Sequence, residues 1–408
     1  YGLLRVLFLI ANLPPLWWGI VLVLLGGLSA FLGALLTVSQ NELKRLLAYC
    51  SIENIGIIFM GIGIGFIGKT TNCIPLEILG FGGALLHVFN HAVFKSLLFL
   101  GAGSVLHSYG TLFINELGGL QKKMPLTGTT FLISSAAICA IPPFNGFISK
   151  FFIYYGAFEG VLKLNGAIEK FLCVFVFTVL CISGTLAIAA FCKAYGTIFL
   201  GEPRTNLNKC HDSEWKMKTS MIFLAFLCVL IGFLSPYMMI ILYFPLKVLA
   251  PGIDISLASD IANILKIIST TFSCMIILFS LLVLARIKFL PRRKKVSESV
   301  TWDCGYIKPS TRMEYTGSSF VNPITKYFRK ILCIYEDYVS PKGFFPKSSS
   351  YQSSVNELFR KYFYDPVFSS FQIICIKLRV IQHGNLQLYV LYIAGTLVVL
   401  LLWKVFFA

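Results

Sequence analysis

Long apolar segments separated by short polar ones make up most of the chain. The segments GIVLVLLGGLSAFLGALLTV, FLCVFVFTVLCISGTLAIAAF and STTFSCMIILFSLLVLA approach or reach the roughly 20 apolar residues that a helix needs to cross a bilayer. A transmembrane β-barrel would show short segments of alternating polarity instead. The pattern therefore predicts an all-α fold, a polytopic transmembrane helix bundle.

Predicted helices fill the first 288 residues, and a last one lies near the C-terminus. After a shorter apolar stretch at 1–12, they cover residues 16–39, 45–67, 77–107, 127–142, 145–161, 168–200, 218–243, 260–288 and 388–407. Residues 77–107 exceed one span, so they predict either two helices or one with a break. We divide the chain into a transmembrane domain at 1–288, a basic segment at 289–387 and a C-terminal helix at 388–408.

One predicted span is interrupted within AAICAIPPFNGFISKFFIYYGAF. Pro142 and Pro143 lack a backbone donor and disfavour the helical conformation in the residue before each, so the helix must break here. Within a bilayer such a break is tolerated only where protein or a water-filled cavity surrounds it, and broken helices are typical of ion pathways in transporters. The segment therefore predicts a broken helix, with a short re-entrant hairpin as the alternative.

The basic segment at 289–387 contains a second pattern. Apolar residues recur there at roughly helical spacing: Val355, Leu358, Phe359, Tyr362, Phe363, Phe371, Ile374 and Leu378. This spacing predicts an amphipathic helix at about 353–379, with Pro366 as a kink, that lies along the membrane surface.

Composition and charge agree with a membrane protein. The chain is 57% hydrophobic and 13% charged, whereas a soluble domain carries about 25% charged residues. The formal charge is +17, and residues 286–379 hold 17 Lys or Arg against 7 Asp or Glu. RRKK at 292–295 follows a predicted span, so that end should face the cytoplasm, with anionic lipid or an acidic partner as counter-charge rather than nucleic acid. We therefore expect a multi-pass protein of the inner, cytoplasmic membrane.

The cysteines do not indicate a metal or redox site. All twelve are scattered singly, without a CxxC motif or a Cys/His cluster, which fits neither an iron–sulfur cluster nor zinc. Small apolar packing residues are the expected role. No haem, flavin or nucleotide fingerprint occurs either, so the sequence predicts no cofactor, no metal and no catalytic residue in this chain.

Ionisable residues inside the predicted spans are the candidate chemistry, because each costs at least about 2.5–3.5 kcal/mol at the centre of a span. In LLHVFNHAVFK, His87, His91 and Lys95 follow one another at four-residue intervals and therefore share one helix face. The others are Lys44, Glu53, Glu77 and Lys150.

Each of these residues has a structural alternative. Lys44 could extend to the interface, Glu53 could form a structural ion pair, and Lys150 could lie at the interface. The functional interpretation is that buried bases with water between them pass protons along, since burial favours the neutral form of Lys and His exchanges protons near neutral pH. The predicted proton relay is Lys44, His87, His91, Lys95 and Lys150, with Glu53 and Glu77 as candidate charge partners.

These residues lie in motifs that resemble a known family. NELKRLLAYCSIENIGII, LLHVFNHAVFKSLLFLGAGSV, GGLQKKMPLT and AIPPFNGFISK resemble the antiporter-like, proton-pumping membrane subunits of respiratory complex I and its relatives. FLGEPR, TWDCGY, RMEYTGSSF and IQHGNLQLYVLYIAGTLVVLLLW are similar to the large membrane subunit of group 4 membrane-bound hydrogenases of the formate hydrogenlyase and hydrogenase-4 type. The similarity extends over essentially all 408 residues.

The resemblance implies roles for particular residues. Lys44 would link two half-channels, the column from His87 to Lys95 would form the central relay, and Lys150 would exchange protons with one side of the membrane. The stretch at 353–379 would be a lateral helix that lies across neighbouring subunits. The family's first half-channel, with its Glu and its first Lys, does not occur in these 408 residues, so we expect a separate polypeptide to supply that N-terminal half.

The sequence therefore predicts a proton- or Na⁺-translocating, non-redox subunit of a redox-driven hydrogenase or complex I-like oxidoreductase. Its expected partners are other membrane subunits, peripheral redox subunits and anionic lipid. One alternative is a subunit of a multi-subunit cation/proton antiporter, against which TWDCGY and RMEYTGSSF argue. The other is a non-conducting membrane scaffold, against which the presence of Lys44, His87, Lys95 and Lys150 argues.

Overall fold

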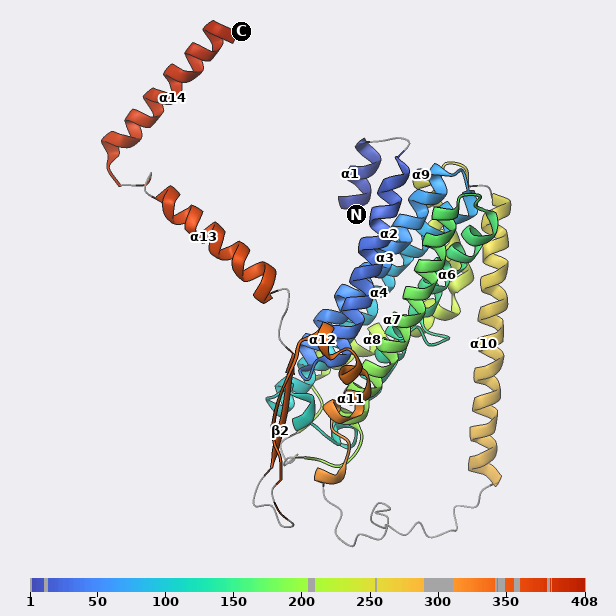
Figure 1. Cartoon of the computed structure of the whole chain (residues 1–408). Coiled ribbons are helices and arrows are strands. Elements are labelled where there is room, and N and C mark those ends of the chain that lie inside the picture. The colour runs from blue at the N-terminus through green and yellow to red at the C-terminus, as the bar shows by residue number, and fades with distance from the viewer. Residues whose placement is uncertain are drawn as a thin grey trace. The chain divides into compact units, whose positions relative to one another are not determined.

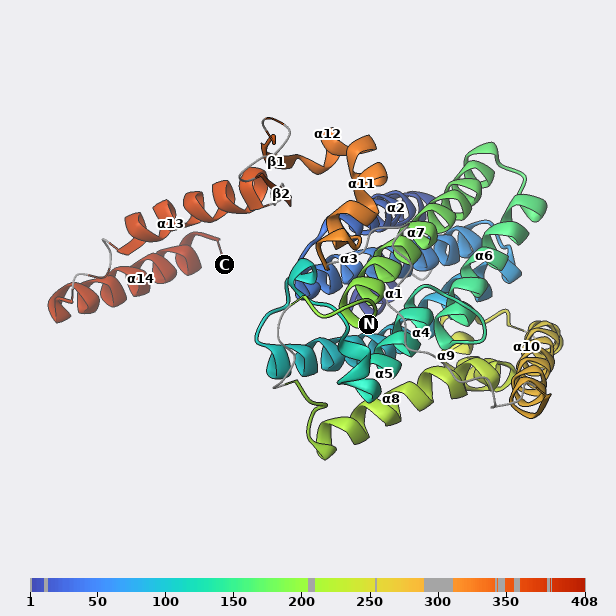
Figure 2. The same ribbon diagram turned by 90° about the horizontal axis from the view of Figure 1, so that it is seen from below.

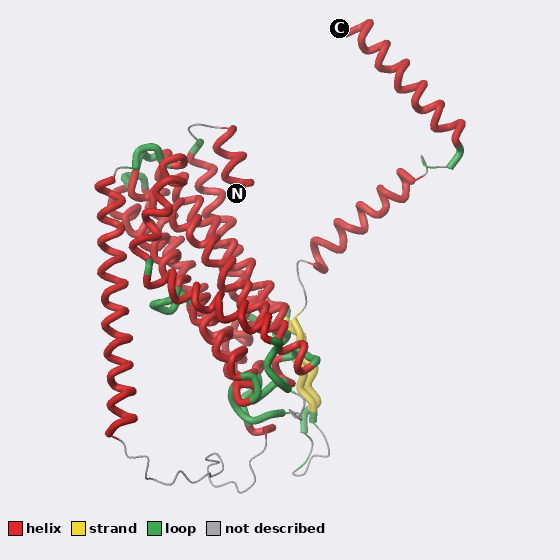
Figure 3. Tube along the Cα trace, turned by 180° about the vertical axis from the view of Figure 1, so that it is seen from behind, coloured by secondary structure: helices red, strands yellow, loops and turns green. Residues whose placement is uncertain are grey.

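The computed structural model describes residues 2–10, 14–204, 210–253, 255–289, 311–341, 343, 349–355, 360–379, 382 and 384–407. The chain forms two compact units, residues 1–329 and 330–408. Helices make up almost all of the first unit and most of the second, which confirms the predicted all-α, polytopic fold (Figures 1 and 3). RRKK at 292–295 and TWDCGY at 301–306 lie outside the described residues.

The first unit is a bundle of helices. In chain order they are α1 (Gly2–Ile10), α2 (Leu16–Ser39), α3 (Leu43–Thr70), α4 (Ile74–Tyr109), α5 (Pro125–Ile138), α6 (Asn145–Lys163), α7 (Ala167–Phe199), α8 (Trp215–Phe233), α9 (Ser235–Leu249), α10 (Ile255–Phe289) and α11 (Gly317–Tyr327), with short 3₁₀ turns η1 (Ile114–Glu116), η2 (Leu120–Lys122) and η3 (Thr311–Met313). A short helix, α12 (Arg329–Leu332), follows. Among the described residues of the two units, seven helices are long and apolar enough to cross a membrane: α2, α3, α4, α7, α8, α10 and the C-terminal α14.

The helices α4 and α7 finish at the same end of this bundle, where α11 packs; this end is called the α11 end below (Figure 1). In the view from below, α5 and α8 lie beside α4, and α10 stands at the edge next to α9 (Figure 2). The alternatives over 77–107 are decided by α4, a single helix of 36 residues. At 1.5 Å per residue it is about 54 Å long, so it extends beyond a hydrocarbon core of about 30 Å.

The predicted helix break is confirmed. Helix α5 ends at Ile138, and α6 begins at Asn145. Between them Ala140 has a φ of 57°, the left-handed conformation that commonly ends a helix. The residues that follow α5 donate to the carbonyls of Ser135, Ala136 and Ala137, whereas that of Ile138 has no backbone partner among the described residues.

The single helix predicted over 218–243 is wrong. Helix α8 ends at Phe233 and α9 begins at Ser235. Pro236 lies in the first turn of α9, where its missing N–H costs nothing, whereas inside one continuous helix it would remove a hydrogen bond.

Glycines let α2 and α3 approach each other closely. A Cβ atom on Gly33 would lie 2.5 Å from the Glu53 nitrogen, and one on Gly56 would lie 2.5 Å from the Ala30 nitrogen. Small residues at such positions are typical of helix pairs in membranes. This contact fixes Glu53 against the last turns of α2.

Replacing Gly56 by alanine should therefore destabilise the bundle by about 1–3 kcal/mol, because the new methyl group overlaps the α2 backbone. Thermal unfolding of the detergent-purified protein measures this effect. Gly184→Ala is the matched control, because a Cβ there on α7 meets no atom within 4 Å. Equal unfolding midpoints for the two variants would contradict the close packing of α2 on α3.

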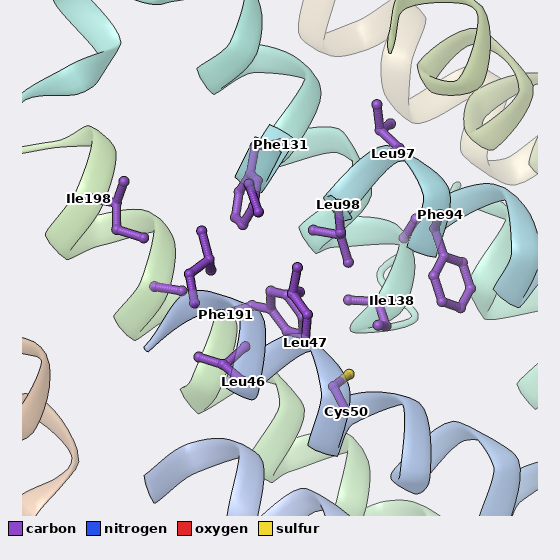
Figure 4. Packing of buried hydrophobic residues seen from close by; sticks show 14 of the residues in the cluster. Leu46, Leu47, Cys50, Phe94, Leu97, Leu98, Phe131, Ile138, Phe191 and Ile198 are labelled. Atoms are coloured by element: carbon purple, nitrogen blue, oxygen red, sulfur yellow. The ribbon is translucent and has the colours of Figure 1, made fainter. Parts of the chain in front are cut away.

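The largest apolar clusters lie between these helices. One cluster gathers Leu47 and Cys50 from α3, Phe94 from α4 and Ile138 from α5, together with Phe191 from α7 (Figure 4). These side chains form the apolar surroundings of the polar residues described below.

The second unit contains a β-hairpin that the sequence did not predict. Strand β1 (Ile334–Val339) pairs antiparallel with β2 (Ser350–Val355), with Ile334 opposite Val355 (yellow in Figure 3). A π-helical turn, η4 (Arg360–Tyr364), then leads into α13 (Asp365–Arg379), and α14 (Leu386–Phe407) ends the chain.

The predicted amphipathic helix at 353–379 is therefore correct only in its later part. Residues 353–355 belong to β2, because they pair with β1, and residues 356–359 lie outside the described residues. From Arg360 onward the chain is helical. The apolar residues of the predicted face that can be assessed are exposed within the unit: Tyr362, Phe363, Phe371, Ile374 and Leu378.

Candidate functional site

Polar side chains gather in the interior of the first unit, where α3 and α4 meet the break between α5 and α6. Eight of them are buried: Glu53, Asn54, His87, Asn90, Lys95, Asn145, Ser149 and Lys150. Burial of so many polar groups in an apolar bundle is costly unless they are paired or used. This set is called the buried row below.

His87 joins three helices at the centre of the row. Its Nε2 atom lies 3.0 Å from Oδ1 of Asn54 on α3, and its Nδ1 atom lies 2.8 Å from Oγ of Ser149 on α6. The Nδ2 group of Asn54 donates to the Cys50 carbonyl at 2.7 Å, so its Oδ1 atom faces the ring. Because that oxygen only accepts, Nε2 donates to it, and Nδ1 of the neutral ring accepts from the Ser149 hydroxyl.

The same geometry accommodates a second proton on His87. The Ser149 hydroxyl also lies 3.3 Å from the Gly146 carbonyl. If Nδ1 carried a proton and donated to Ser149, the hydroxyl could turn and donate to Gly146 instead. Each of the two protonation states of His87 therefore has a complete set of partners.

The two lysines of the row are held by backbone carbonyls. The Lys95 ammonium donates to the Leu47 carbonyl on α3 and lies 5.5 Å from the ring centre of Phe99. The Lys150 ammonium donates to the Ile138 carbonyl at 3.1 Å. Because Ile138 is the last residue of α5, the helix break supplies the acceptor for Lys150.

Glu53 is the buried carboxylate on which both lysines act electrostatically. It is 0% exposed, and neither carboxylate oxygen accepts a hydrogen bond from the described residues. The positive charges that act on it come from Lys150 and Lys95. Two ammonium groups from different helices therefore act electrostatically on one carboxylate, without an ion pair to either among the described residues.

A pair of asparagines holds the start of α6 against α4. Asn90 donates through Nδ2 to the Asn145 carbonyl at 2.8 Å, and Asn145 donates through Nδ2 to Oδ1 of Asn90 at 3.3 Å. These bonds fix the helix break relative to the column on α4. They also set the position of Ser149 and Lys150, which follow on α6.

Three predicted site residues lie outside this network. Lys44 is exposed, and it does not join the row. His91 is partly exposed, with its ring 5.6 Å from that of Phe94, and its buried Nε2 atom has no partner among the described residues. Glu77 lies ten positions before His87, about 15 Å along α4, where Lys69 pairs with it at 3.6 Å. Their assigned roles stay predictions.

The sequence did not single out Lys193, although it carries the same signal as the others, an ionisable residue within an apolar helix. It lies on α7 and is 1% exposed. Its ammonium donates to the carbonyls of Val38 at 2.9 Å and Gln40 at 2.5 Å. The neutral partners Asn54, Asn90 and Ser149 were not predicted either, because nothing in their own helices marks them.

Metal ligands do not cluster in the part of the chain that the structure describes, since no three His, Cys, Asp or Glu side chains come together there. What the row offers is a set of proton donors and acceptors on three helices.

Comparisons with known proteins show which family the chain resembles. Residues 1–177 match the family described as NADH:quinone oxidoreductase/Mrp antiporter, TM. The chain is 35% identical to formate hydrogenlyase subunit 3 of Escherichia coli (strain K12), over 81% of this chain and 53% of that protein. It is 32% identical to hydrogenase-4 component B of the same strain, over 95% of this chain and 59% of that protein.

A solved structure supports the fold. The chain resembles one chain of the membrane-bound sulfane sulfur reductase, an archaeal respiratory membrane complex, with a TM-score of 0.61 and 23% identity. The match covers 94% of this chain and 56% of that one.

The helix bundle with its broken helix and buried row defines an antiporter-like membrane protein. The chain belongs to the superfamily of complex I and group 4 hydrogenases, which confirms the predicted resemblance. It spans about half the length of the curated relatives that it matches, 53% and 59% for the two described above.

Proposed function

We propose that this chain moves protons across the inner, cytoplasmic membrane as a non-redox subunit of a redox-driven hydrogenase or complex I-like oxidoreductase. The observation that carries the proposal is the connection of α3, α4 and α6 through His87, whose two ring nitrogens both have partners. A proton carrier needs a group that is satisfied in both protonation states, and His87 has that arrangement.

Charge sharing would link His87 to the lysines. Glu53 can carry one negative charge, and Lys95 and Lys150 together can carry two positive ones. With Glu53 ionised, the row is most nearly neutral when one lysine has released its proton. The titrations of such groups are coupled, and a proton that leaves one lysine changes the affinity of the other. Waters at the unpartnered oxygens of Glu53 would complete a path between them.

The chemistry of the row favours H⁺ over Na⁺ as the transported ion. Two ammonium groups repel a metal cation, whereas they can themselves bind and release a proton. The side chains of the row are bases and hydrogen-bonding amides, and Glu53 supplies its carboxylate.

Partners follow from the relatives, which are by name subunits of hydrogenlyase and hydrogenase complexes. We propose other membrane subunits and peripheral redox subunits as the partners of this chain, with anionic lipid near the basic segment that follows α10. If that segment faces the cytoplasm, as the positive-inside rule predicts, so does the α11 end of the bundle. Electron chemistry and any cofactor would then belong to the redox subunits.

The test uses the purified complex reconstituted into vesicles, with proton uptake recorded during electron transfer. His87→Gln should lower coupled uptake by at least about tenfold, because glutamine makes similar hydrogen bonds but cannot carry an extra proton. His107→Gln is the matched control, since His107 is exposed on the same helix.

Uptake at the parental rate in the His87→Gln complex would rule out His87 as a carrier. Proton movement that persists without any electron transfer would instead favour a cation/proton antiporter, which the matched family also includes by name.

A further inference from the structure

A surface pocket of ≈ 240 Å³ lies in front of Lys193 at the α11 end of the bundle. Its walls come from α7, the loop after α7 and the segment around α11: Cys192, Lys193, Gly196, Thr197, Leu200, Arg204, Glu314, Tyr315 and Phe320. The buried lysine therefore forms part of the pocket wall, although its side chain is almost completely shielded from solvent.

Hydrogen bonds between distant parts of the chain build the mouth of this pocket. The Glu314 carboxylate accepts from the Glu202 backbone nitrogen at 3.1 Å. The Arg204 guanidinium donates to the carbonyls of Asn115 at 3.1 Å and Tyr315 at 2.9 Å. These hydrogen bonds hold the mouth of the pocket together, and Glu314 and Arg204 place an acidic and a basic side chain on its wall.

The acceptors of Lys193 are neutral oxygens at the end of α2. Val38 is the second-last residue of α2, and Gln40 is the first residue after the helix ends. Both carbonyls therefore lie at the negative end of the helix dipole. Gly317, the first residue of α11, covers the stem of the lysine, because a Cβ there would lie 3.2 Å from its Cε atom. Lys193 thus lies between a surface pocket and the bundle interior.

The last turns of α2 lead from Lys193 to the buried row. Thr37 is buried beside Val38, and its hydroxyl donates to the Gly33 carbonyl at 2.7 Å. Gly33 in turn packs directly against Glu53. Gly33 and Val38 are five positions apart, about 7.5 Å along α2, and the Thr37 hydroxyl lies between them.

We propose that this pocket and Lys193 form the opening through which protons pass between the α11 end of the bundle and the buried row. The inference rests on the proposed function, since it adds an entry to the same row. Lys193 takes a proton from water in the pocket, and the proton continues past Thr37 to Glu53. The competing explanation is that Lys193 only caps the C-terminus of α2.

Two substitutions separate these explanations in vesicles of the reconstituted complex. Lys193→Met removes both the charge and the cap. Lys193→Arg keeps the positive charge and the donors but does not release its proton. If Lys193 carries protons, neither methionine nor arginine can replace it. Both variants should then lose at least about tenfold in coupled proton uptake. Lys170→Met, on the same helix at the other end, is the matched control.

Proton uptake at the parental rate in the Lys193→Arg complex would overturn the carrier role. Lys193 would then only cap the C-terminus of α2. Thermal unfolding of each variant complex shows whether the larger arginine has disturbed the bundle. If it has, a second measurement decides the question.

That measurement uses Cys192, which lines the same pocket and is exposed. A water-soluble, positively charged methanethiosulfonate should slow uptake in the parental complex at least about tenfold by placing a fixed charge in the pocket. In a Cys192→Ser complex the same reagent should leave the rate unchanged from that of the untreated variant. An equal effect of the reagent with and without Cys192 would overturn the proposal.

The outcomes also distinguish this inference from the proposed function. If the His87→Gln complex loses uptake while the Lys193 variants and the treated complex keep it, only the opening is wrong. If the His87→Gln complex keeps uptake, the row itself is wrong.

Discussion

Replacing Lys150 by alanine should abolish coupled proton uptake in the reconstituted complex while electron transfer persists or slows. We expect a loss of about two orders of magnitude or more, the range in which removal of a proton-transferring group falls. Lys150 is the one ionisable residue of the row that lies on α6. Its loss also removes one of the two positive charges that act on Glu53.

The position of Lys150 makes this effect specific. Its ammonium donates to the Ile138 carbonyl, which the break after α5 leaves free. Lys163→Ala is the matched control, because Lys163 is an exposed lysine on the same helix that pairs with Glu159 at 2.7 Å. The control should keep proton uptake and electron transfer together. Parental uptake in the Lys150→Ala complex would remove Lys150 from the path.

Replacing Lys95 by alanine should have the second large effect, again a loss of coupled proton uptake. The Lys95 ammonium is the final basic group of the α4 column and donates to the Leu47 carbonyl. Its removal should also destabilise the complex, because truncating a buried side chain of this length leaves a cavity. Lys123→Ala, at an exposed position, is the control for both readouts.

A double substitution tests whether Lys95 and Glu53 act together. If they share charge, Lys95→Ala should change the stability of the parental complex and of a Glu53→Gln complex by different amounts, because the carboxylate that responds to the ammonium is absent from the second. Proton uptake should stay low in both complexes that lack Lys95. Stabilities that simply add would show that the two groups do not interact.

Much of the fold could be predicted from the sequence because it depends on local patterns. The apolar length of each span and the Pro142-Pro143 pair determine where helices form and where one breaks. The four-residue spacing of His87, His91 and Lys95 determines their shared face in the same way. These features need no knowledge of which helix packs against which.

The remaining features depend on contacts between distant segments. Asn54 meets His87 across 33 positions, and Lys193 meets Val38 across 155. Such pairings leave no periodic signal, so the partners were not predicted. The β-hairpin was missed because its pairing of Ile334 with Val355 is non-local, and the apolar spacing around Val355 also fits a helix.

A motif match alone does not determine where the Lys44 side chain lies. The motif NELKRLLAY assigns it to the relay, but the first turn of α3 leaves its side chain exposed while Arg45 beside it pairs with Glu42. A helix of 3.6 residues per turn places only part of any motif toward the interior. The residues that do lie inside are Glu53 and Asn54.

The central claim is that the buried row carries protons, and the ratio of protons taken up to electrons transferred tests it most directly. Both quantities should be recorded in the same vesicles for the parental, Lys150→Ala and Lys163→Ala complexes. We predict that the ratio falls in Lys150→Ala alone, with electron transfer still measurable. A ratio equal to the parental value in Lys150→Ala would contradict the account.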